Sequence, residues 1–451
     1  PMTSFVGYEP LFGAHINHAG LCAGCHTLIT ETADLEGNAT GGEFVEQATY
    51  HEWLNSKFND QEHPETGITC QGCHVPRIDD GVVLSANYIF LQPRSPFGLH
   101  DFAGANTFML GLLKNNIDAL GLSADATQFD STIQRTERML RNGLLVEASM
   151  ADRTADTAFI DVKLTNLAGH KFPSGYPARR AWVELVVTDA NGDTLFHNGA
   201  WDGSYDVVGH DASWEPHHDV IRNTEDVQIY EMVMADVNGD KTTVLERAAD
   251  KLKDNRLTPE LFSSAHYTND TVFIANVPPT DADFNRYDNG DEGSGSDIVH
   301  YHVPMNGFTG LVNVRARVWY QSAPPRWMEE MFAYNSAEID TFRNMYLAED
   351  VSPFLVKEET FSDVSTGVDD LAELGVRIAP NPTPDGQLVI TGLGPEVIGA
   401  EVYDLRGGLV AAHRANNGST WHLRLPAGPS TYLVSIRTPQ RTFVERVVSL
   451  R

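Results

Sequence analysis

The chain has 451 residues, of which 62 are acidic and 32 basic, so its formal net charge is −30 at pH 7. This excess of acid argues against binding to nucleic acid or to anionic membrane surfaces, since both require clustered lysine and arginine. Hydrophobic residues make up 41% of the chain, which is enough for a folded core and excludes a disordered polypeptide.

Residues 1–149 are predicted to form a helical, loop-rich domain. The segments 103–121 and 131–148 repeat apolar residues at helical spacing, and Ser131 is the expected N-cap of the second. Two motifs precede these helices, "CAGCH" at 22–26 and "CQGCH" at 70–74, and together they contain all four cysteines of the chain.

The pattern C-x-x-C-H is typical of a c-type haem attachment site. Two thiols at this spacing can form thioethers with the two vinyl groups of one porphyrin, and the following imidazole is then held beneath the iron as an axial ligand. A four-thiolate zinc site, a redox dithiol and a disulfide framework are alternatives, but none of them needs a histidine after each pair. We therefore expect two covalently bound haem c groups, one on Cys22, Cys25 and His26 and one on Cys70, Cys73 and His74.

The rest of the chain is predicted to be mainly β. Residues 150–357 read as a β-sandwich, because 158–167 alternates apolar and polar residues and 181–199 reads as strand, Asn-Gly turn, strand. The segment 329–348 is an expected helix near its end. Residues 358–375 are polar and acidic and are predicted to be a linker, and 376–451 a small C-terminal all-β sandwich. The predicted fold class is therefore α+β and multidomain.

Several stretches resemble a family of exported bacterial multihaem c-type cytochromes, over roughly residues 8–350. They include "LCAGCHTL", "TYHEWLNSKFND", "LHDFAGANTFML", "LTNLAGHKFPSGYPARRAW" and "PHHDVIRNTEDVQIYEMVMAD". The resemblance implies that His100 and His170 are distal haem ligands and that each iron has two axial histidines. The histidines just before the first motif, His15 and His18, are less favoured candidates. This chain has two attachment sites where many relatives have more.

Arg179 and Arg180 follow His170 closely in "GHKFPSGYPARR". Haem propionates need cationic partners when they are partly buried, so both arginines are candidate propionate partners. Surface arginines are the alternative interpretation.

The C-terminal residues resemble the sorting domain of type IX secretion substrates. The matching stretches are "IAPNP" (378–382), "VYDLRGGLV" (402–410) and the terminal "ERVVSLR". The resemblance implies a secreted or cell-surface protein that is handled by the type IX secretion machinery. Covalent haem attachment, which is made outside the cytoplasm, agrees with export.

Two further sets of polar residues are candidate metal sites. Asp281, Asp283 and Asn285 alternate like the start of a calcium-binding loop, although Arg286 stands where that loop needs glycine. The pairs His217–His218 and His300–His302 could bind metal, and are more simply interpreted as loop residues.

The sequence therefore predicts a dihaem cytochrome c that relays electrons to a redox protein or an extracellular acceptor, and no catalytic residue is assigned. One alternative is a haem enzyme that acts on a small nitrogen or oxygen compound at an open axial site. Another is a surface binding module, or a homo-oligomer or filament with haems between protomers.

Overall fold

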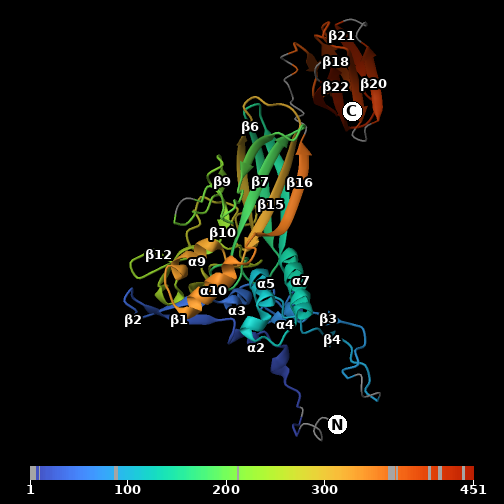
Figure 1. Cartoon of the computed structure of the whole chain (residues 1–451). Helices are drawn as coiled ribbons and strands as arrows, with labels where there is room; N and C mark the ends of the chain where they lie inside the picture. The colour runs from blue at the N-terminus through green and yellow to red at the C-terminus, as the bar shows by residue number, and fades with distance from the viewer. Residues whose placement is uncertain are drawn as a thin grey trace. The chain divides into compact units, whose positions relative to one another are not determined.

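The computed structural model describes residues 7–9, 11–85, 90–210, 213–363, 371, 374–404, 408–414, 419–438 and 442–450. The chain is α+β and divides into two compact units (Figure 1). The larger unit holds residues 1–152, 157–304 and 313–362, and the smaller one 153–156, 305–312 and 363–451. The predicted domains 1–149 and 150–357 thus fall largely within the larger unit.

The N-terminal part of the larger unit is built from short helices and a hairpin. In chain order these are η1 (Ala14–Asn17), α2 (Gly20–Ala23), β1 (Leu28–Ala33), β2 (Ala39–Gln47), α3 (Thr49–Leu54), α4 (Cys70–His74), β3 (Arg77–Ile78), β4 (Phe97–Gly98), α5 (Thr107–Asn115), α6 (Ile117–Leu120) and α7 (Ala126–Asn142). Figure 1 shows helices α2 to α7 gathered at one end of the long strands.

Helix α7 begins earlier than the sequence pattern indicates. The Asp125 carboxylate accepts a hydrogen bond from Gln128 N, and the Gln128 side chain accepts one from Asp125 N, which forms a capping box. The predicted cap at Ser131 is wrong, because Ser131 already lies inside the helix and donates to Thr127 O. Residues 144–148, predicted to be helical, belong to strand β5, whose first residues alternate between buried and exposed.

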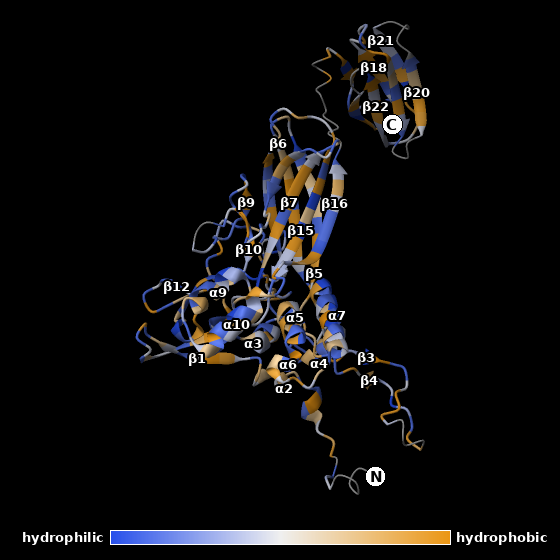
Figure 2. Ribbon diagram, viewed as in Figure 1, coloured by the Kyte–Doolittle hydropathy of each residue, from blue (hydrophilic) through white to orange (hydrophobic). Residues whose placement is uncertain are grey.

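The middle of the chain forms two four- or five-stranded sheets in a sandwich-like arrangement. One has the order β5-β6-β14-β9, and the other has the order β10-β7-β15-β16 with β8 also paired to β7. The strands are β5 (Leu144–Arg153), β6 (Thr157–Asn166), β7 (Arg180–Asp189), β8 (Thr194–Asn198), β9 (Val220–Ile221), β10 (Ile229–Tyr230), β14 (Ser296–Pro304), β15 (Val312–Gln321) and β16 (Phe354–Asp363). Strands β6 and β15 alternate buried and half-buried residues, as a sheet with one core-facing side requires (Figure 2). The predicted strand–turn–strand at 181–199 is confirmed by β7 and β8.

The connections between these strands carry smaller elements. They are β11 (Met232–Ala235), β12 (Lys241–Thr242), η2 (Leu245–Arg247), β13 (Asp250–Asp254), α8 (Asn269–Val272), α9 (Pro325–Phe332) and α10 (Ala337–Leu347). The single helix expected at 329–348 is two helices, because the Ser336 hydroxyl accepts from Ile339 N and caps a new start. The linker predicted at 358–375 is also too long, since β16 continues to Asp363 and Arg317 on β15 pairs with Glu358.

The smaller unit contains the expected C-terminal all-β sandwich. Its sheets have the orders β17-β18-β21 and β20-β19-β22-β23, and the strands are β17 (Arg377–Ala379), β18 (Gln387–Thr391), β19 (Gly399–Asp404), β20 (Leu409–Arg414), β21 (Thr420–Arg424), β22 (Ser430–Arg437) and β23 (Thr442–Ser449). Its buried core includes Ile390, Val402 and Val434. Asn381, in the "PNP" stretch, donates to Arg446 O and accepts from Val448 N, which ties the start of this unit to its last strand.

A buried cluster of ion pairs joins the helical part of the larger unit to its β part. Asp254 bonds to Lys171 Nζ at 2.8 Å and to Arg256 through two contacts, and Arg256 also reaches Glu52 on α3 at 3.1 Å. Burial alone would raise the pKa of Asp254, but the charges of Arg256 and Lys171 outweigh it and hold that pKa well below its usual range. Asp254 is therefore ionised in the folded protein at every ordinary pH.

Replacing the central carboxylate is expected to be costly. Asp254→Asn leaves three buried cations, Lys171, Lys251 and Arg256, without their shared partner and should lower the free energy of unfolding by about 3–5 kcal/mol, measured by denaturant unfolding. Because the folded-state pKa is depressed, the stabilisation is present above the unfolded pKa of about 4 and is lost as pH falls below it.

The matched control is Asp193→Asn, in an exposed turn, which should change the free energy by no more than about 0.5 kcal/mol. If the two substitutions lowered the free energy of unfolding equally, the cluster would not stabilise the fold. The same conclusion would follow if the stability of Asp254→Asn depended on pH as that of the wild type does.

Candidate functional site

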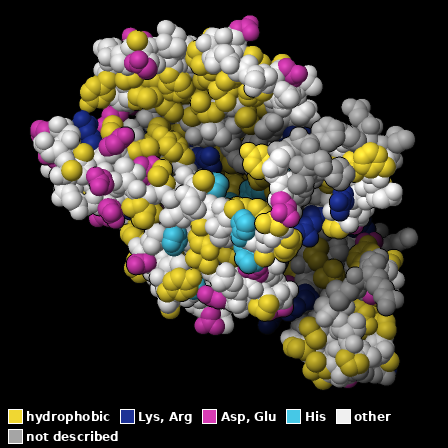
Figure 3. Space-filling view, turned by 90° about the horizontal axis from the view of Figure 1, so that it is seen from below, with side chains coloured by type: hydrophobic (Ala, Val, Ile, Leu, Met, Phe, Trp, Pro, Cys, Tyr) yellow, Lys and Arg dark blue, Asp and Glu magenta, His cyan; other side chains and the backbone are white. Residues whose placement is uncertain are grey.

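The two C-x-x-C-H motifs lie side by side. Gln71 on α4 donates through Nε2 to the carbonyls of Ile16 and His18 at 2.9 Å each, which holds the segment before the first motif against the second. Burial, and then the neighbouring Cys22 thiol, raise the pKa of Cys70 to about 12. Figure 3 shows histidine side chains gathered on this lower face, beside a hollow with hydrophobic side chains.

All four cysteines are free thiols in this structure. Neither of the metal-ligand clusters found in the described part of the chain contains a cysteine.

The rings of His74 and His170 lie near each other and are close to parallel. Their centroids are 6.4 Å apart and their planes are inclined by 24°. His74 Nδ1 lies 2.8 Å from Ala103 O, and His170 Nδ1 lies 3.1 Å from Lys171 O. Since a carbonyl only accepts, both rings carry their proton on Nδ1 in the neutral form and keep the Nε2 lone pair for a metal.

The spacing of these rings suits one metal ion bound from two sides. Each ligating nitrogen lies about 2 Å from its metal, so two imidazoles on opposite sides of one ion have centroids about 6 Å apart. Hydrogen bonds from Nδ1 to backbone carbonyls are the usual outer partners of metal-binding imidazoles. Burial lowers the pKa of His170, which keeps this ring in the neutral form that binds metal.

The loop that carries His170 is fixed by contacts on three sides. Asn166 donates to His170 O at 2.7 Å, and Lys171 N donates to the Glu52 carboxylate at 3.0 Å. Phe172 and Leu257 exchange two backbone hydrogen bonds of 2.8 Å. Gly169 packs against α3 and the residues after it. The ring is therefore held by the fold and not by a flexible surface loop.

Arg179 lies close to His26 and His170 and has a side-chain donor without a partner. Its Nη1 donates to Ser174 O at 2.7 Å, while its buried Nε has no hydrogen-bond partner. Partial burial lowers the pKa of His26, and the charges of His74 and Arg179 lower it further. An anionic group such as a propionate would satisfy the orphaned Nε, so the residues present fit a haem at this place.

The other predicted ligands are exposed side chains in segments that lie against the second motif: Phe102 N donates to His74 O at 2.9 Å, and Gln71 Nε2 donates to His18 O. His100 is exposed and its ring packs on Phe102, with a centroid distance of 5.9 Å. His15 and His18 are also exposed. Among the contacts of the described residues, none places a second imidazole opposite His26.

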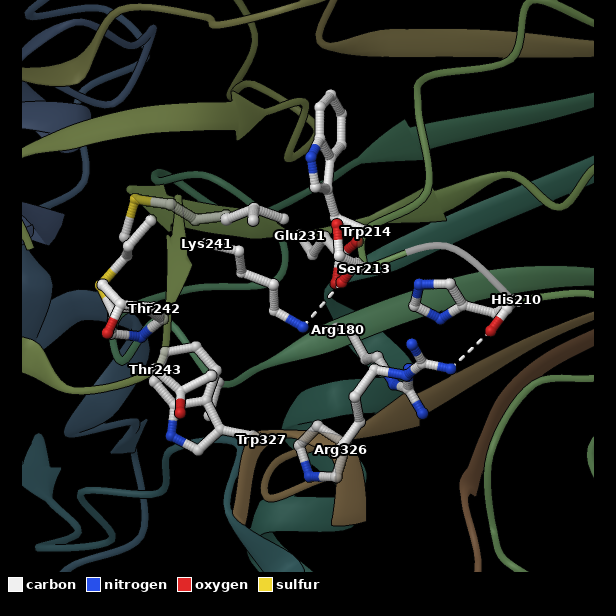
Figure 4. A pocket seen from close by; sticks show the side chains of 16 residues that line it. Arg180, His210, Ser213, Trp214, Glu231, Lys241, Thr242, Thr243, Arg326 and Trp327 are labelled. Atoms are coloured by element: carbon white, nitrogen blue, oxygen red, sulfur yellow. Dashed lines mark hydrogen bonds between the residues drawn. The ribbon is translucent and has the colours of Figure 1, made fainter. Parts of the chain in front are cut away.

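Arg180 points elsewhere, so its predicted contact with a propionate is wrong. Its guanidinium donates to Gln321 Oε1 and to Asp206 at 2.8 Å, and it is only 2% exposed. It lines a small cavity of about 30 Å³ with His210, Lys241 and Arg326 (Figure 4). If this buried arginine turned toward a second anion, it would leave the carboxylate with which it is already paired, and that is energetically costly.

The predicted calcium loop does not form, because its three oxygen ligands diverge. Asp281 accepts from His217 at 2.8 Å, Asp283 from His300 at 2.8 Å, and Asn285 from the Thr258 hydroxyl at 2.7 Å. Of the remaining histidines in the two pairs, His218 bonds to Glu215, and His302 to Arg222.

Sequence reasoning missed Glu52. Its carboxylate is 1% exposed and fixes the His170 loop from a helix 119 residues earlier. A charged residue directly before the apolar pair Trp53–Leu54 is the only local signal, and that signal does not identify its partner.

Comparisons with known proteins identify no family for this chain and find only low structural similarity. No protein-family model matches the chain, and no curated protein matches it. Among solved structures, a penta-haem cytochrome c552 from Thermochromatium tepidum aligns with a TM-score of 0.40 and 16% identity, over 77% of this chain and 57% of that one. The chain thus spans little more than half the length of that cytochrome. The native conformation of alpha-2-macroglobulin from E. coli aligns with a TM-score of 0.15 and 13% identity, over 68% of this chain and 16% of that one.

The packing of the His170 loop on α3 can be tested at Gly169. A Cβ at this position would lie 3.1 Å from Phe58 Cδ2 and from Trp53 Cδ1. Gly169→Ala should therefore lower the free energy of unfolding by about 1–3 kcal/mol, measured in denaturant.

Gly104→Ala is the control, because a Cβ there meets nothing within 4 Å. This change should be neutral or stabilise by up to about 1 kcal/mol through the unfolded state. If both variants behaved alike, the loop would not be tightly packed on α3.

Proposed function

We propose that this chain is a dihaem c-type cytochrome that carries electrons. The observation that carries the proposal is the pair of rings at 6.4 Å, His74 from a C-x-x-C-H motif and His170 from the β6–β7 loop. Each ring is bonded to a backbone carbonyl through Nδ1 and keeps Nε2 for iron. The thiols of Cys70 and Cys73 would hold this haem, and those of Cys22 and Cys25 the other.

A bound haem supplies an iron that changes between its ferric and ferrous states by one electron. If His74 and His170 both held this iron, they would leave it no position for a substrate, and electron transfer would be favoured over catalysis at this haem. Because the ion-paired loop holds His170 and the bond to Ala103 O orients His74, little needs to move when the charge of the iron changes.

Arg179 is the proposed partner of a haem propionate. Its unsatisfied Nε would donate to the carboxylate, and its positive charge lies near both His26 and His170. The adjacent motifs suggest that the two haems lie near each other, which suits transfer between them.

The second candidate function is a haem enzyme at the first motif. In the described part of the chain no imidazole is placed opposite His26, so this iron would have an accessible face for a small nitrogen or oxygen compound. His100, predicted as a distal ligand, is exposed and lies beyond the second motif. Binding of carbon monoxide to one haem in the wild-type protein would favour this function.

We further infer that the protein is exported and that residues 376–451 act as a type IX sorting domain. The inference rests on the resemblance of its terminal stretches, and its β-sandwich has a core of its own. No helix among the described residues is long and apolar enough to span a membrane. The proposed partners are the secretion machinery and a redox protein or extracellular electron acceptor.

Removing the proposed distal ligand tests the function. His170→Ala should convert one of the two haems from low-spin to high-spin and open it to carbon monoxide, seen by optical and electron paramagnetic resonance spectroscopy. The mass of the purified chain should exceed that of the polypeptide by two porphyrins.

His197→Ala, in strand β8, is the control and should leave both spectra unchanged. Unaltered spin states in His170→Ala would remove His170 as a ligand. A mass without porphyrin, or zinc in its place, would refute the cytochrome itself.

The charge of Arg179 should also affect the reduction potential of a nearby haem. A nearby cation favours the reduced, more electron-rich iron, so Arg179→Gln should lower the reduction potential of at least one haem, measured by spectroelectrochemical titration. Lys163→Gln, on β6, is the control and should leave the potentials unchanged. Identical potentials in wild type and Arg179→Gln would argue against a propionate contact.

A further inference from the structure

Two groups of metal-ligating residues lie in the β part of the larger unit, away from the cysteine motifs. Three chain segments, 217–219, 281–283 and 297–300, each contribute one residue to each group. The inner group is buried and consists of His217, Asp281 and Asp297. The outer group is half-buried and consists of Asp219, Asp283 and His300.

The inner group is closed to a metal by its hydrogen bonds. His217 Nδ1 accepts from the amide nitrogens of Gln228 and Asn255, at 2.9 and 3.1 Å. Both amides are fixed in this orientation, because their oxygens accept backbone N–H groups from His218 and Glu231. His217 must therefore carry its proton on Nε2, which donates to Asp281 at 2.8 Å.

The outer group has the opposite arrangement. Strands β14 and β6 place His300 directly opposite Asp161, and His300 Nδ1 lies 2.6 Å from that carboxylate. Nε2 then faces Asp283 at 2.8 Å and Asp219 at 4.0 Å. Asp219 directly precedes β9, which pairs with β14. A carboxylate on Nδ1 that leaves Nε2 for a metal is the usual outer shell of a metal-binding imidazole.

The charge around the two groups is not balanced by the protein. Five carboxylates meet here, those of Asp161, Asp219, Asp281, Asp283 and Asp297. In the described residues their ion pairs are with His217 and His300, and none is with a lysine or arginine. Asp297 is 1% exposed, and its Oδ1 is buried without a hydrogen-bond partner. The negative charges of Asp281 and Asp283 both act on this buried carboxylate.

We propose that Asp219, Asp283 and His300 bind a divalent transition-metal ion, with Asp161 orienting the imidazole. Their side chains are 29–31% exposed, so an ion can enter and keep water on its remaining positions. One imidazole nitrogen with two carboxylate oxygens suits Zn²⁺ or Mn²⁺, whereas Ca²⁺ prefers six to eight oxygens. The ion displaces the proton that His300 Nε2 shares with Asp283, and that proton leaves to solvent.

The test is metal binding by the whole haem-loaded protein after treatment with a chelator. Calorimetric titration with Zn²⁺ and with Mn²⁺ should show one site per chain for at least one of them, and Ca²⁺ should bind more weakly. His300→Gln and Asp219→Asn should each weaken binding tenfold or more, and Asp161→Asn by about 10–100-fold.

His302→Gln is the matched control, two residues along the same face of β14, and should bind as the wild type does. Circular dichroism shows whether each variant is folded. If His300→Gln does not fold, the metal affinity of Asp219→Asn is the deciding measurement. Absence of a titratable site in the wild type, equal affinity in Asp219→Asn, or preference for Ca²⁺ would each overturn the proposal. Because His300→Gln and Asp219→Asn leave both cysteine motifs intact, zinc bound by free thiols would persist in these variants, which distinguishes failure of the haem proposal from failure of this one.

Discussion

The hydrogen bond from Lys171 N to the Glu52 carboxylate is the contact on which the rest of the site depends. It ties the loop between two sandwich strands to a helix of the N-terminal region, and the residue before Lys171, His170, has its ring near His74. Buried charges of this kind are costly unless every one is paired. Asp254 pairs with Lys171 and with Arg256, and Arg256 pairs with Glu52, so these charges are paired and the loop is held in place.

This arrangement explains why the N-terminal region and the sandwich form one compact unit. Under the proposed ligation, one iron is bound by residues from both regions, so binding of the cofactor also joins the two parts of the fold. The ion cluster and the cofactor then act on the same interface, the first through backbone and side-chain contacts and the second through its axial ligands.

The two histidines of the β region show how neighbouring side chains decide what a ring can do. His217 is surrounded by amide donors, which fix its proton on Nε2 and leave it no role with a metal. His300 lies against carboxylates, which place a proton on Nδ1 and leave Nε2 facing two further oxygens. The hydrogen-bond partners of each ring thus separate a structural histidine from a proposed metal ligand.

The amino-acid sequence by itself determined the features that depend on short spacing. The motif C-x-x-C-H, the alternation along β6 and the strand–turn–strand of β7 and β8 are local, and each was predicted from adjacent residues. Only the tertiary structure decided which distant side chains meet: His170 with His74, Glu52 with Lys171, and Asp283 with His300. Arg179 and Arg180 are neighbours in the sequence, yet the first lies near His26 and His170 and the second is paired with Asp206 and Gln321, because successive side chains at the start of a strand point to opposite sides. Local patterns do not carry that information, since it depends on the elements that pack on each side.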